Sequence, residues 1–214
     1  MWAIKATGLT FRYPGLELFD RLDLELDPGE IRAVLGPSGS GKTTLVHLLA
    51  GILPLQEGRL WWGDTEVSRL GEDELARLRR DRVGLVFQHH YLLDELTALE
   101  NVMVPGLIAG APDRARALEL LERVGLRRQA DQLPASLSGG ERQRAAVARA
   151  LYPRPRVILA DEPTGSLDRD NAERVRDLLA ELAQENGAAV LFATHDEALV
   201  SGWPAWHLAD GRLN

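Results

Sequence analysis

One short stretch limits what this chain can fold into more than any other feature. It reads Gly36-Pro37-Ser38-Gly39-Ser40-Gly41-Lys42-Thr43, and Thr44 follows it. It comes directly after the apolar segment Ile31 to Leu35, which predicts a buried strand, and opens a helical pattern that runs to Ala50. Glycines let backbone N–H groups approach phosphate oxygens, and the start of the helix adds positive charge. The stretch therefore predicts a phosphate-binding loop between a strand and a helix.

The side chains of this loop have separate expected roles. Lys42 can reach the β- and γ-phosphates of a nucleotide, and the Thr43 hydroxyl can bind Mg²⁺. We assign the whole run to nucleotide binding: Gly36, Pro37, Ser38, Gly39, Ser40, Gly41, Lys42, Thr43 and Thr44. On its own the motif indicates only a P-loop NTPase, because kinases, GTPases and helicases carry it too.

The remaining apolar pattern predicts an α/β fold. The segments Val83 to Phe87, Val157 to Ala160 and Val190 to Ala193 are apolar on both faces, which is typical of parallel strands covered by helices. Residues 2–26 alternate in polarity around Pro14-Gly15, which predicts antiparallel strands joined by a turn. Further helices are predicted at Arg169 to Asn186 and at Glu197 to roughly Gly202.

The middle of the chain has a different pattern. From about residue 92 to 152, helix-compatible stretches alternate with prolines and glycines, and there is little strand signal. We expect a RecA-like α/β core, the fold of P-loop NTPases, with an N-terminal antiparallel β subdomain and an inserted α-helical subdomain. The helical part takes about residues 92–152, and the core with its β subdomain takes about 1–91 and 153–214. A chain of 214 residues suits one such domain.

Composition excludes several classes of function. Lys and Arg number 25 against 32 Asp and Glu, a net charge of -7 that argues against binding nucleic acid. There is no cysteine, hence no disulfide and no thiolate site. The first residues lack a signal-peptide pattern, and no apolar run approaches the roughly 18 residues of a membrane helix. We therefore expect a cytoplasmic protein that does not itself cross a membrane.

Two adjacent carboxylates follow the predicted strand at Val157 to Ala160. Side chains alternate along a strand, so Asp161 and Glu162 should point in different directions. That arrangement suits Asp161 near Mg²⁺ and Glu162 as the base beside an attacking water. The alternative is an acidic pair that merely opens a solvated loop, because acidic strand ends are common.

A second anion site is predicted within Leu137-Ser138-Gly139-Gly140-Glu141-Arg142-Gln143-Arg144. Ser138 and Glu141 form an S-x-x-E capping box for a helix expected at Glu141 to Leu151. Gly139 and Gly140 leave the first N–H groups open to a phosphate. A helix cap alone is commonplace. In a chain whose first loop already binds one nucleotide, however, a second phosphate-binding helix start implies either a second ligand or a ligand shared between two sites.

The run from Leu137 to Glu141 resembles the signature sequence of ABC ATPases, with Glu141 where many members carry Gln. Together with the phosphate-binding loop and the Asp161-Glu162 pair, the resemblance covers essentially the full chain. It implies the ABC ATPase fold, ATP and Mg²⁺ as ligands, and a homodimer in the ATP-bound state. In that dimer Ser138, Gly139, Gly140 and Glu141 would contact the ATP held by the opposite subunit.

The resemblance also implies roles for single residues. Tyr13 is similar to the aromatic residue that stacks on adenine, although a strand core residue is the alternative. Gln88 resembles the glutamine that touches Mg²⁺ and senses the membrane partner, and Asp168 lies in the loop that crosses between subunits. His195 resembles the histidine that contacts the γ-phosphate. The implied catalytic residues are Glu162, His195, Lys42 and Gln88, and the implied metal ligands are Thr43, Gln88 and Asp161.

Within the family, Phe87 to Leu93 and Leu96 to Val102 resemble the lipoprotein-releasing and macrolide-export class. That class implies separate transmembrane permease subunits, which we expect to dock near the lid at Gln88 to Leu93. The chain would then be peripheral on the inner face of the cell membrane. Two alternatives stay open: a regulatory ATPase of the cell-division type, which belongs to the same class, and a soluble ABC ATPase that acts on DNA or ribosomes.

Overall fold

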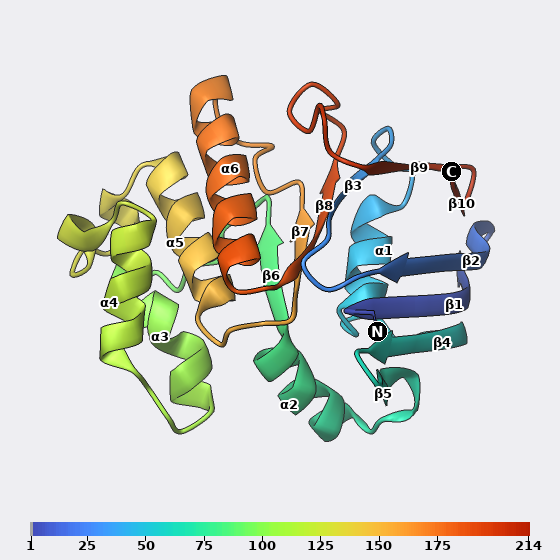
Figure 1. Ribbon diagram of the computed structural model, residues 1–214, viewed down its shortest axis with the longest axis horizontal. Helices are drawn as coiled ribbons and strands as arrows, with labels where there is room; N and C mark the ends of the chain where they lie inside the picture. The colour runs from blue at the N-terminus through green and yellow to red at the C-terminus, as the bar shows by residue number, and fades with distance from the viewer. Residues whose placement is uncertain (1) are drawn as a thin grey trace.

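Two β-sheets and a group of helices build the protein, as the computed structural model shows for residues 2–214 (Figure 1). The strand order is β2-β1-β4-β5 in one sheet and β10-β9-β3-β8-β7-β6 in the other. The strands are β1 Ile4–Tyr13, β2 Leu16–Leu26, β3 Ile31–Leu35, β4 Glu57–Trp62, β5 Thr65–Glu66, β6 Val83–Phe87, β7 Val157–Asp161, β8 Ala189–Thr194, β9 Ala205–Ala209 and β10 Arg212–Leu213. The helices are α1 Lys42–Leu49, α2 Glu72–Arg82, α3 Ala98–Ile108, α4 Arg114–Arg123, α5 Gly139–Leu151 and α6 Arg169–Glu185, with 3₁₀ turns η1 Val67–Arg69, η2 Arg127–Gln129 and η3 Pro134–Ser136.

The first sheet is antiparallel, as the alternating N-terminal pattern predicts. Strand β1 pairs with β2 and with β4, and the turn at Pro14-Gly15 brings Tyr13 opposite Leu16. Tyr13 therefore stands at the end of a strand, beside the first residue of the next one.

The second sheet has a parallel centre that serves two apolar cores. Strands β3, β8, β7 and β6 run parallel. On β7, Val157 and Leu159 belong to the core that includes α1 and the antiparallel sheet, whereas Ile158 and Ala160 belong to the core shared with α3 to α6. Side chains alternate along a strand, so a strand that is apolar on both faces packs against both layers. Figure 1 shows α1 between the two sheets and α5 and α6 on the other side.

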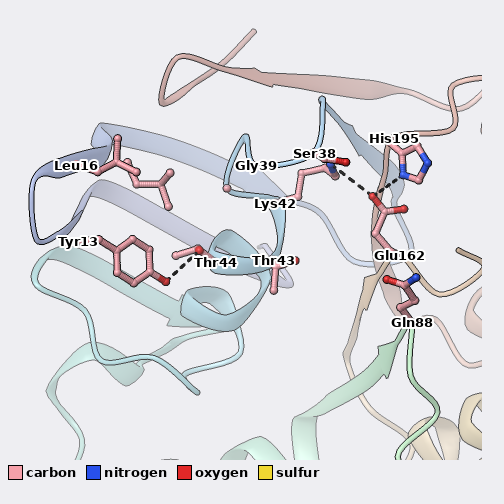
Figure 2. Close-up of a pocket in the computed structure, with 12 residues that line it drawn as sticks. Tyr13, Leu16, Ser38, Gly39, Lys42, Thr43, Thr44, Gln88, Glu162 and His195 are labelled. Carbon is pink, nitrogen blue, oxygen red and sulfur yellow. Dashed lines mark hydrogen bonds and ion pairs between the residues drawn. The ribbon is translucent and has the colours of Figure 1, made fainter.

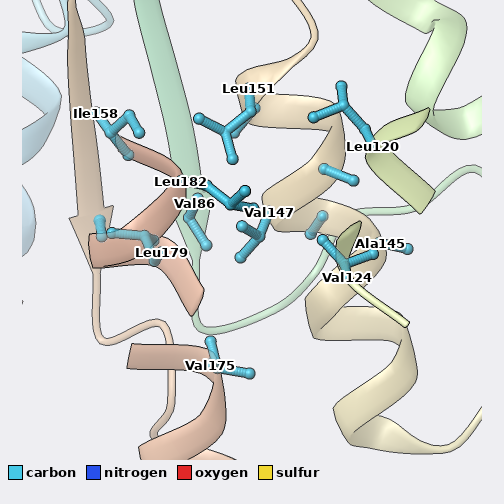
Figure 3. Packing of buried hydrophobic residues seen from close by; sticks show 14 of the residues in the cluster. Val86, Leu120, Val124, Ala145, Val147, Leu151, Ile158, Val175, Leu179 and Leu182 are labelled. Atoms are coloured by element: carbon cyan, nitrogen blue, oxygen red, sulfur yellow. The ribbon is translucent and has the colours of Figure 1, made fainter. Parts of the chain in front are cut away.

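The helical core consists of closely packed aliphatic side chains. Figure 3 shows Ile158 of β7 together with Val147 and Leu151 of α5 and Leu179 of α6. These four side chains are fully buried. Burying each such side chain contributes about 1.5–3 kcal/mol relative to exposure. This core therefore holds α5 firmly against the sheet whose ends carry the site described below.

Between β6 and β7 the chain forms helices and turns, and residues 88–156 contain no strand. Helix α5 begins at Gly139, two residues before the predicted start, because the capping box places its N-cap at Ser138. Ser138 Oγ accepts from the Glu141 N–H at 3.3 Å, and Glu141 Oε2 accepts from the Ser138 N–H at 2.8 Å, which confirms the predicted box. Among residues 2–214, no helix is long and apolar enough to span a membrane.

The fold class predicted from sequence is confirmed: an α/β core with an antiparallel sheet on one side and helices on the other. One helix prediction was wrong. Residues 197–202 form turns, in which Asp196 Oδ1 accepts from the Leu199 N–H at 3.0 Å. Gly202 has φ 89° and Pro204 follows, so the chain cannot continue a helix there.

Candidate active site

A cleft of about 470 Å³ opens at the carboxyl ends of the parallel strands, where open α/β sheets bind their ligands (Figure 2). Lys42 reaches it from α1, which follows β3, and Gln88 follows β6. Glu162 and His195 follow β7 and β8. The cleft is lined by Tyr13, Leu16, Leu18, Ser38, Gly39, Gly41, Lys42, Thr43, Thr44, Gln88, Glu162 and His195.

The loop between β3 and α1 has a shape that needs its glycines. Gly39 and Gly41 have φ 83° and 101°, in the left-handed region that favours glycine. A Cβ on Gly36 would lie 2.6 Å from the backbone oxygen of Leu208, so no side chain fits there. Gly41 caps α1 without a side-chain acceptor, which leaves the first N–H groups of α1 without a side-chain partner. Such groups at a helix start bind anions.

Lys42 places a buried positive charge at the centre of this loop. The side chain is only 6% exposed. Its Nζ donates to the carbonyl oxygens of Gly36 at 2.7 Å and Pro37 at 3.1 Å, and it lies 3.5 Å from Glu162 Oε1. These partners give the ammonium group two hydrogen bonds and one ion pair. Together with the helix start, Lys42 makes this end of the cleft suited to phosphate.

Glu162 is anchored through both oxygens of its carboxylate. Oε1 lies 3.0 Å from His195 Nδ1, in addition to its contact with Lys42, and Oε2 accepts from the Thr194 hydroxyl at 3.2 Å. Its backbone has φ 46°, which is uncommon outside glycine and recurs at functional sites. The predicted divergence of Asp161 and Glu162 therefore does not come from strand alternation, because β7 ends at Asp161 and Glu162 lies outside the strand.

Asp161 is a buried carboxylate with an unused acceptor. It is 7% exposed, and its Oδ1 has no hydrogen-bond partner. Burial raises the pKa of Asp161, against the lowering effect of a hydrogen bond with Thr43. A buried carboxylate oxygen without a partner is costly unless a donor or cation meets it. Thr43 and Asp161 thus supply two oxygen ligands of the kind that a hard divalent cation takes.

The opposite end of the cleft is aromatic and apolar. Tyr13 is 44% exposed, which excludes the alternative that it is a strand core residue. Its ring contacts Phe11 edge-on, and its hydroxyl lies 3.3 Å from Thr44 Oγ1. Leu16 and Leu18 line the same end and were not predicted. Their i, i+2 spacing on β2 places both on one face, which is the signal that sequence analysis could have used.

The predicted second anion site lies apart from this cleft. Ser138 and Gly139 are exposed, and none of Ser138, Gly139, Gly140 or Glu141 lines the cleft. Asp168 is also exposed and caps α6, where its Oδ1 accepts from the Asn171 N–H at 2.9 Å. That bond lowers the pKa of Asp168. The cleft around Lys42 and the exposed start of α5 at Ser138 are therefore separate candidate phosphate sites within this chain.

Sequence comparison identifies the family. The ABC transporter family model matches residues 19–165, which is most of the chain. The lipoprotein-releasing system ATP-binding protein LolD of Bacteroides fragilis (strain YCH46) is 44% identical over 214 residues, and the match covers 98% of this chain and 99% of that protein.

Structural comparison agrees. A dimeric post-hydrolysis state of the ATP-binding cassette MJ0796, bound to ADP and Pi, has a TM-score of 0.88 and 36% identity, covering 99% of this chain and 96% of the other. The cbiO1 protein of Clostridium perfringens, part of the ABC transporter complex cbiONQ, has a TM-score of 0.89 and 27% identity, covering 100% of this chain and 87% of the other. The chain therefore belongs to the ABC transporter family, as one of its ATP-binding and ATP-hydrolysing cassettes.

Proposed function

We propose that the chain is the ATPase subunit of a lipoprotein-releasing ABC transporter and works as a homodimer beneath separate permease subunits. The observation that carries the dimer is the pair of phosphate-binding surfaces: the cleft around Lys42 and the exposed start of α5 at Ser138. If each cleft binds one ATP, the start of α5 has no ligand within its own chain. The ATP bound in the cleft of a second copy of the chain would supply one. The dimeric state of the related cassette supports this arrangement.

ATP would lie along the cleft with its adenine at the apolar end. The exposed ring of Tyr13 offers a stacking surface, and Leu16 and Leu18 add apolar contact. The run from Gly36 to Thr44 would surround the phosphates with backbone N–H groups, as in other phosphate-binding loops. Lys42 would exchange its carbonyl partners for β- and γ-phosphate oxygens.

Magnesium fits the free acceptors beside the phosphates. The proposed ligands are Thr43, Asp161 and Gln88, of which Asp161 has the unpartnered buried oxygen. Mg²⁺ characteristically binds through one or two carboxylates plus substrate phosphates. When bound, it would neutralise charge on the β- and γ-phosphates. Within residues 2–214, no group of three or more His, Cys, Asp or Glu side chains is placed to hold a metal ion.

Hydrolysis would begin when Glu162 holds a water in line with the γ-phosphate and accepts its proton. Lys42 and His195 would stabilise the charge that spreads over the phosphoryl oxygens. Gln88, which lies next to Glu162 in Figure 2 on the side away from His195, would report the occupancy of the site to the rest of the lid. From the second copy, Ser138, Gly139, Gly140 and Glu141 would close over the γ-phosphate, and Asp168 would lie at the junction between the subunits.

Permease docking is proposed at a groove beside the lid. A hollow of about 350 Å³ lies between α2, β6 and α3, and its lining is mostly apolar. Tyr91 and Ile108 on its walls are 62% and 69% exposed. Arg149 fixes the lid by donating to the carbonyl oxygens of His90 and Tyr91. Exposed aromatic and aliphatic side chains around a fixed loop suit a short amphipathic segment of a permease, which would hold the chain at the inner face of the membrane.

The decisive test of the ATPase is Glu162→Gln. This variant should bind ATP and form a stable dimer, yet hydrolyse ATP at least about a hundredfold more slowly, because it lacks the base. Size-exclusion chromatography with ATP and a phosphate-release assay measure the two properties. Turnover at the wild-type rate would refute Glu162 as the base.

The lipoprotein assignment rests on relatives, so it needs a test of its own. The chain, co-purified with its permease and placed in vesicles that contain a labelled lipoprotein, should release that lipoprotein on addition of ATP. Retention of the lipoprotein while ATP is hydrolysed would contradict the assignment and leave the ATPase intact. Tyr91→Asp should prevent co-purification without changing the nucleotide site.

A further inference from the structure

The carboxylate of Glu162 has a third partner that plays no part in the mechanism above. Thr194 is the last residue of β8 and is 1% exposed. Its hydroxyl donates to Glu162 Oε2 at 3.2 Å and accepts from the Asp196 N–H at 3.1 Å. A hydroxyl has one proton, and the Asp196 contact uses an acceptor site. The proton of Thr194 is therefore directed at Glu162.

This bond differs from the other two contacts of the carboxylate. Lys42 and His195 line the cleft, and both are expected to turn to the phosphates when ATP binds. Thr194 does not line the cleft, so ATP does not compete for its hydroxyl. The strand also holds the neighbouring backbone, because the Glu162 N–H donates to the Ala193 oxygen at 2.8 Å. Of the three side chains that contact the carboxylate, only Thr194 lies outside the space that ATP would fill.

We propose that Thr194 is a positioning residue for hydrolysis: its hydroxyl holds Oε2 of Glu162 so that Oε1 faces the attacking water. The backbone of Glu162, at φ 46°, has a sparsely populated conformation of the kind that surrounding contacts must maintain. Without the hydroxyl the carboxylate can rotate away from the water, whereas the surfaces that bind ATP are unchanged. This inference rests on the proposed role of Glu162 as the base.

Thr194→Val tests it, because valine keeps the shape and removes the donor. We expect kcat to fall about tenfold, equivalent to about 1.4 kcal/mol, with KM for ATP unchanged, because the variant loses a hydrogen bond to the charged base and keeps the surfaces that bind ATP. Thr194→Ser should recover most of the rate because it restores the hydroxyl. A valine variant within twofold of wild type would overturn the proposal, as would equal losses in the valine and serine variants or a rise in KM without a fall in kcat.

A double-mutant cycle with Glu162→Gln separates positioning from general damage. In the Gln background the base is absent, so adding Thr194→Val should not slow the residual single-turnover rate further. A second tenfold loss there would overturn the proposal. If Glu162→Gln itself turns over normally, the proposed function fails first. Because Thr194→Val also removes an acceptor for Asp196, melting curves establish that it folds, and Thr194→Ala serves as the second donor-free variant if it does not.

Discussion

The ammonium group of Lys42 lies 3.5 Å from the Glu162 carboxylate, so the proposed phosphate ligand and the proposed base form an ion pair inside the cleft. The pair is largely buried: Lys42 is 6% exposed and Glu162 is 16% exposed. The ion pair between Lys42 and Glu162 is expected to last only while no phosphate is bound, because the phosphate would compete for Lys42. In the proposed mechanism, binding ATP would draw Lys42 toward the triphosphate and free one side of Glu162 for water, which would couple ligand binding to activation of the base.

Lys42→Met removes the cation from this pair. ATP binding should weaken about 10–100-fold, because charge-assisted hydrogen bonds to phosphate are lost, and hydrolysis should fall to background. Isothermal titration calorimetry with ATP measures the affinity. Lys5→Met is the matched control, since Lys5 is the only other lysine in the chain and pairs with Glu25 on β2, away from the cleft. Equal affinity in wild type and Lys42→Met would contradict a phosphate role.

Gly36→Ala tests the close approach behind the phosphate loop. The new Cβ would lie 2.6 Å from the Leu208 backbone oxygen and 2.7 Å from Ser40 Oγ, so the loop must move. We expect a destabilisation of about 1–3 kcal/mol from overpacking and weaker ATP binding. Gly71→Ala is the control, because a Cβ there meets nothing within 4 Å and φ is -67°. Chemical denaturation compares both; identical curves would show that the loop absorbs the methyl group.

Asp161→Asn should separate stability from catalysis. Burial raises the pKa of Asp161, which means that the folded protein disfavours its negative charge when no cation is present. The neutral amide should therefore raise the melting temperature of the nucleotide-free protein. Hydrolysis with Mg²⁺ should fall at least about a hundredfold, because the cation loses its carboxylate ligand. Asp177→Asn, an exposed carboxylate on α6, should change neither property.

The sequence predicted the elements whose pattern is local. Buried strands such as β3 and β6 match their predicted bounds, because a short run that is apolar on both faces can form few structures other than a buried strand. The capping box at Ser138 also needs only neighbouring residues. The helix predicted after Asp196 was wrong because two local signals conflict. Residues that favour a first helical turn are followed closely by Gly202 and Pro204, which end a helix, and the residue pattern alone does not show which signal prevails.

Contacts between distant strands were not predictable in the same way. Leu16 and Leu18 lie beside Tyr13 only because the antiparallel pairing brings them there. The Thr194 bond to Glu162 depends on the parallel register of β7 and β8 and on the left-handed backbone of Glu162. Only the resemblance to a family pointed to Ser138 and Asp168 as residues proposed to act across subunits, because neither lines the cleft of its own chain.

Ser138→Asp distinguishes the cap of α5 from its proposed contact with ATP in the dimer. Aspartate is about as good an N-cap as serine, so the melting temperature of the single chain should hardly change. Its negative charge would face the γ-phosphate held by the second copy, and ATP-dependent dimerisation and hydrolysis should both be lost. Ser138→Thr keeps a neutral hydroxyl cap and should retain both. Normal turnover by Ser138→Asp with its permease bound would exclude the shared site.

His90 should make the lid sensitive to acid. Its Nδ1 accepts from the Leu92 N–H at 3.1 Å, which requires a neutral ring. Burial, followed by the nearby charges of Arg142 and Arg149, lowers the pKa of His90. The folded state therefore binds a proton less readily than the unfolded chain. Titration of His90 leaves the free energy of unfolding unchanged at pH values above the histidine pKa of the unfolded chain, about 6.5. Below that pH the free energy of unfolding decreases, until the pH has passed through the lowered pKa of His90 in the folded state.

His90→Asn removes this titration and keeps an acceptor for Leu92. We expect the wild type to lose more melting temperature than His90→Asn between about pH 7.5 and pH 5, with the difference confined to the acidic side of the unfolded histidine pKa of about 6.5. His89→Asn is the matched control, because His89 is the exposed neighbour of His90 in the lid. It should follow the wild-type pH dependence. Parallel curves for wild type and His90→Asn would show that protonation of His90 does not disturb the lid, because Arg149 still binds the carbonyl oxygens of His90 and Tyr91 and Asn101 still binds the backbone of Leu93.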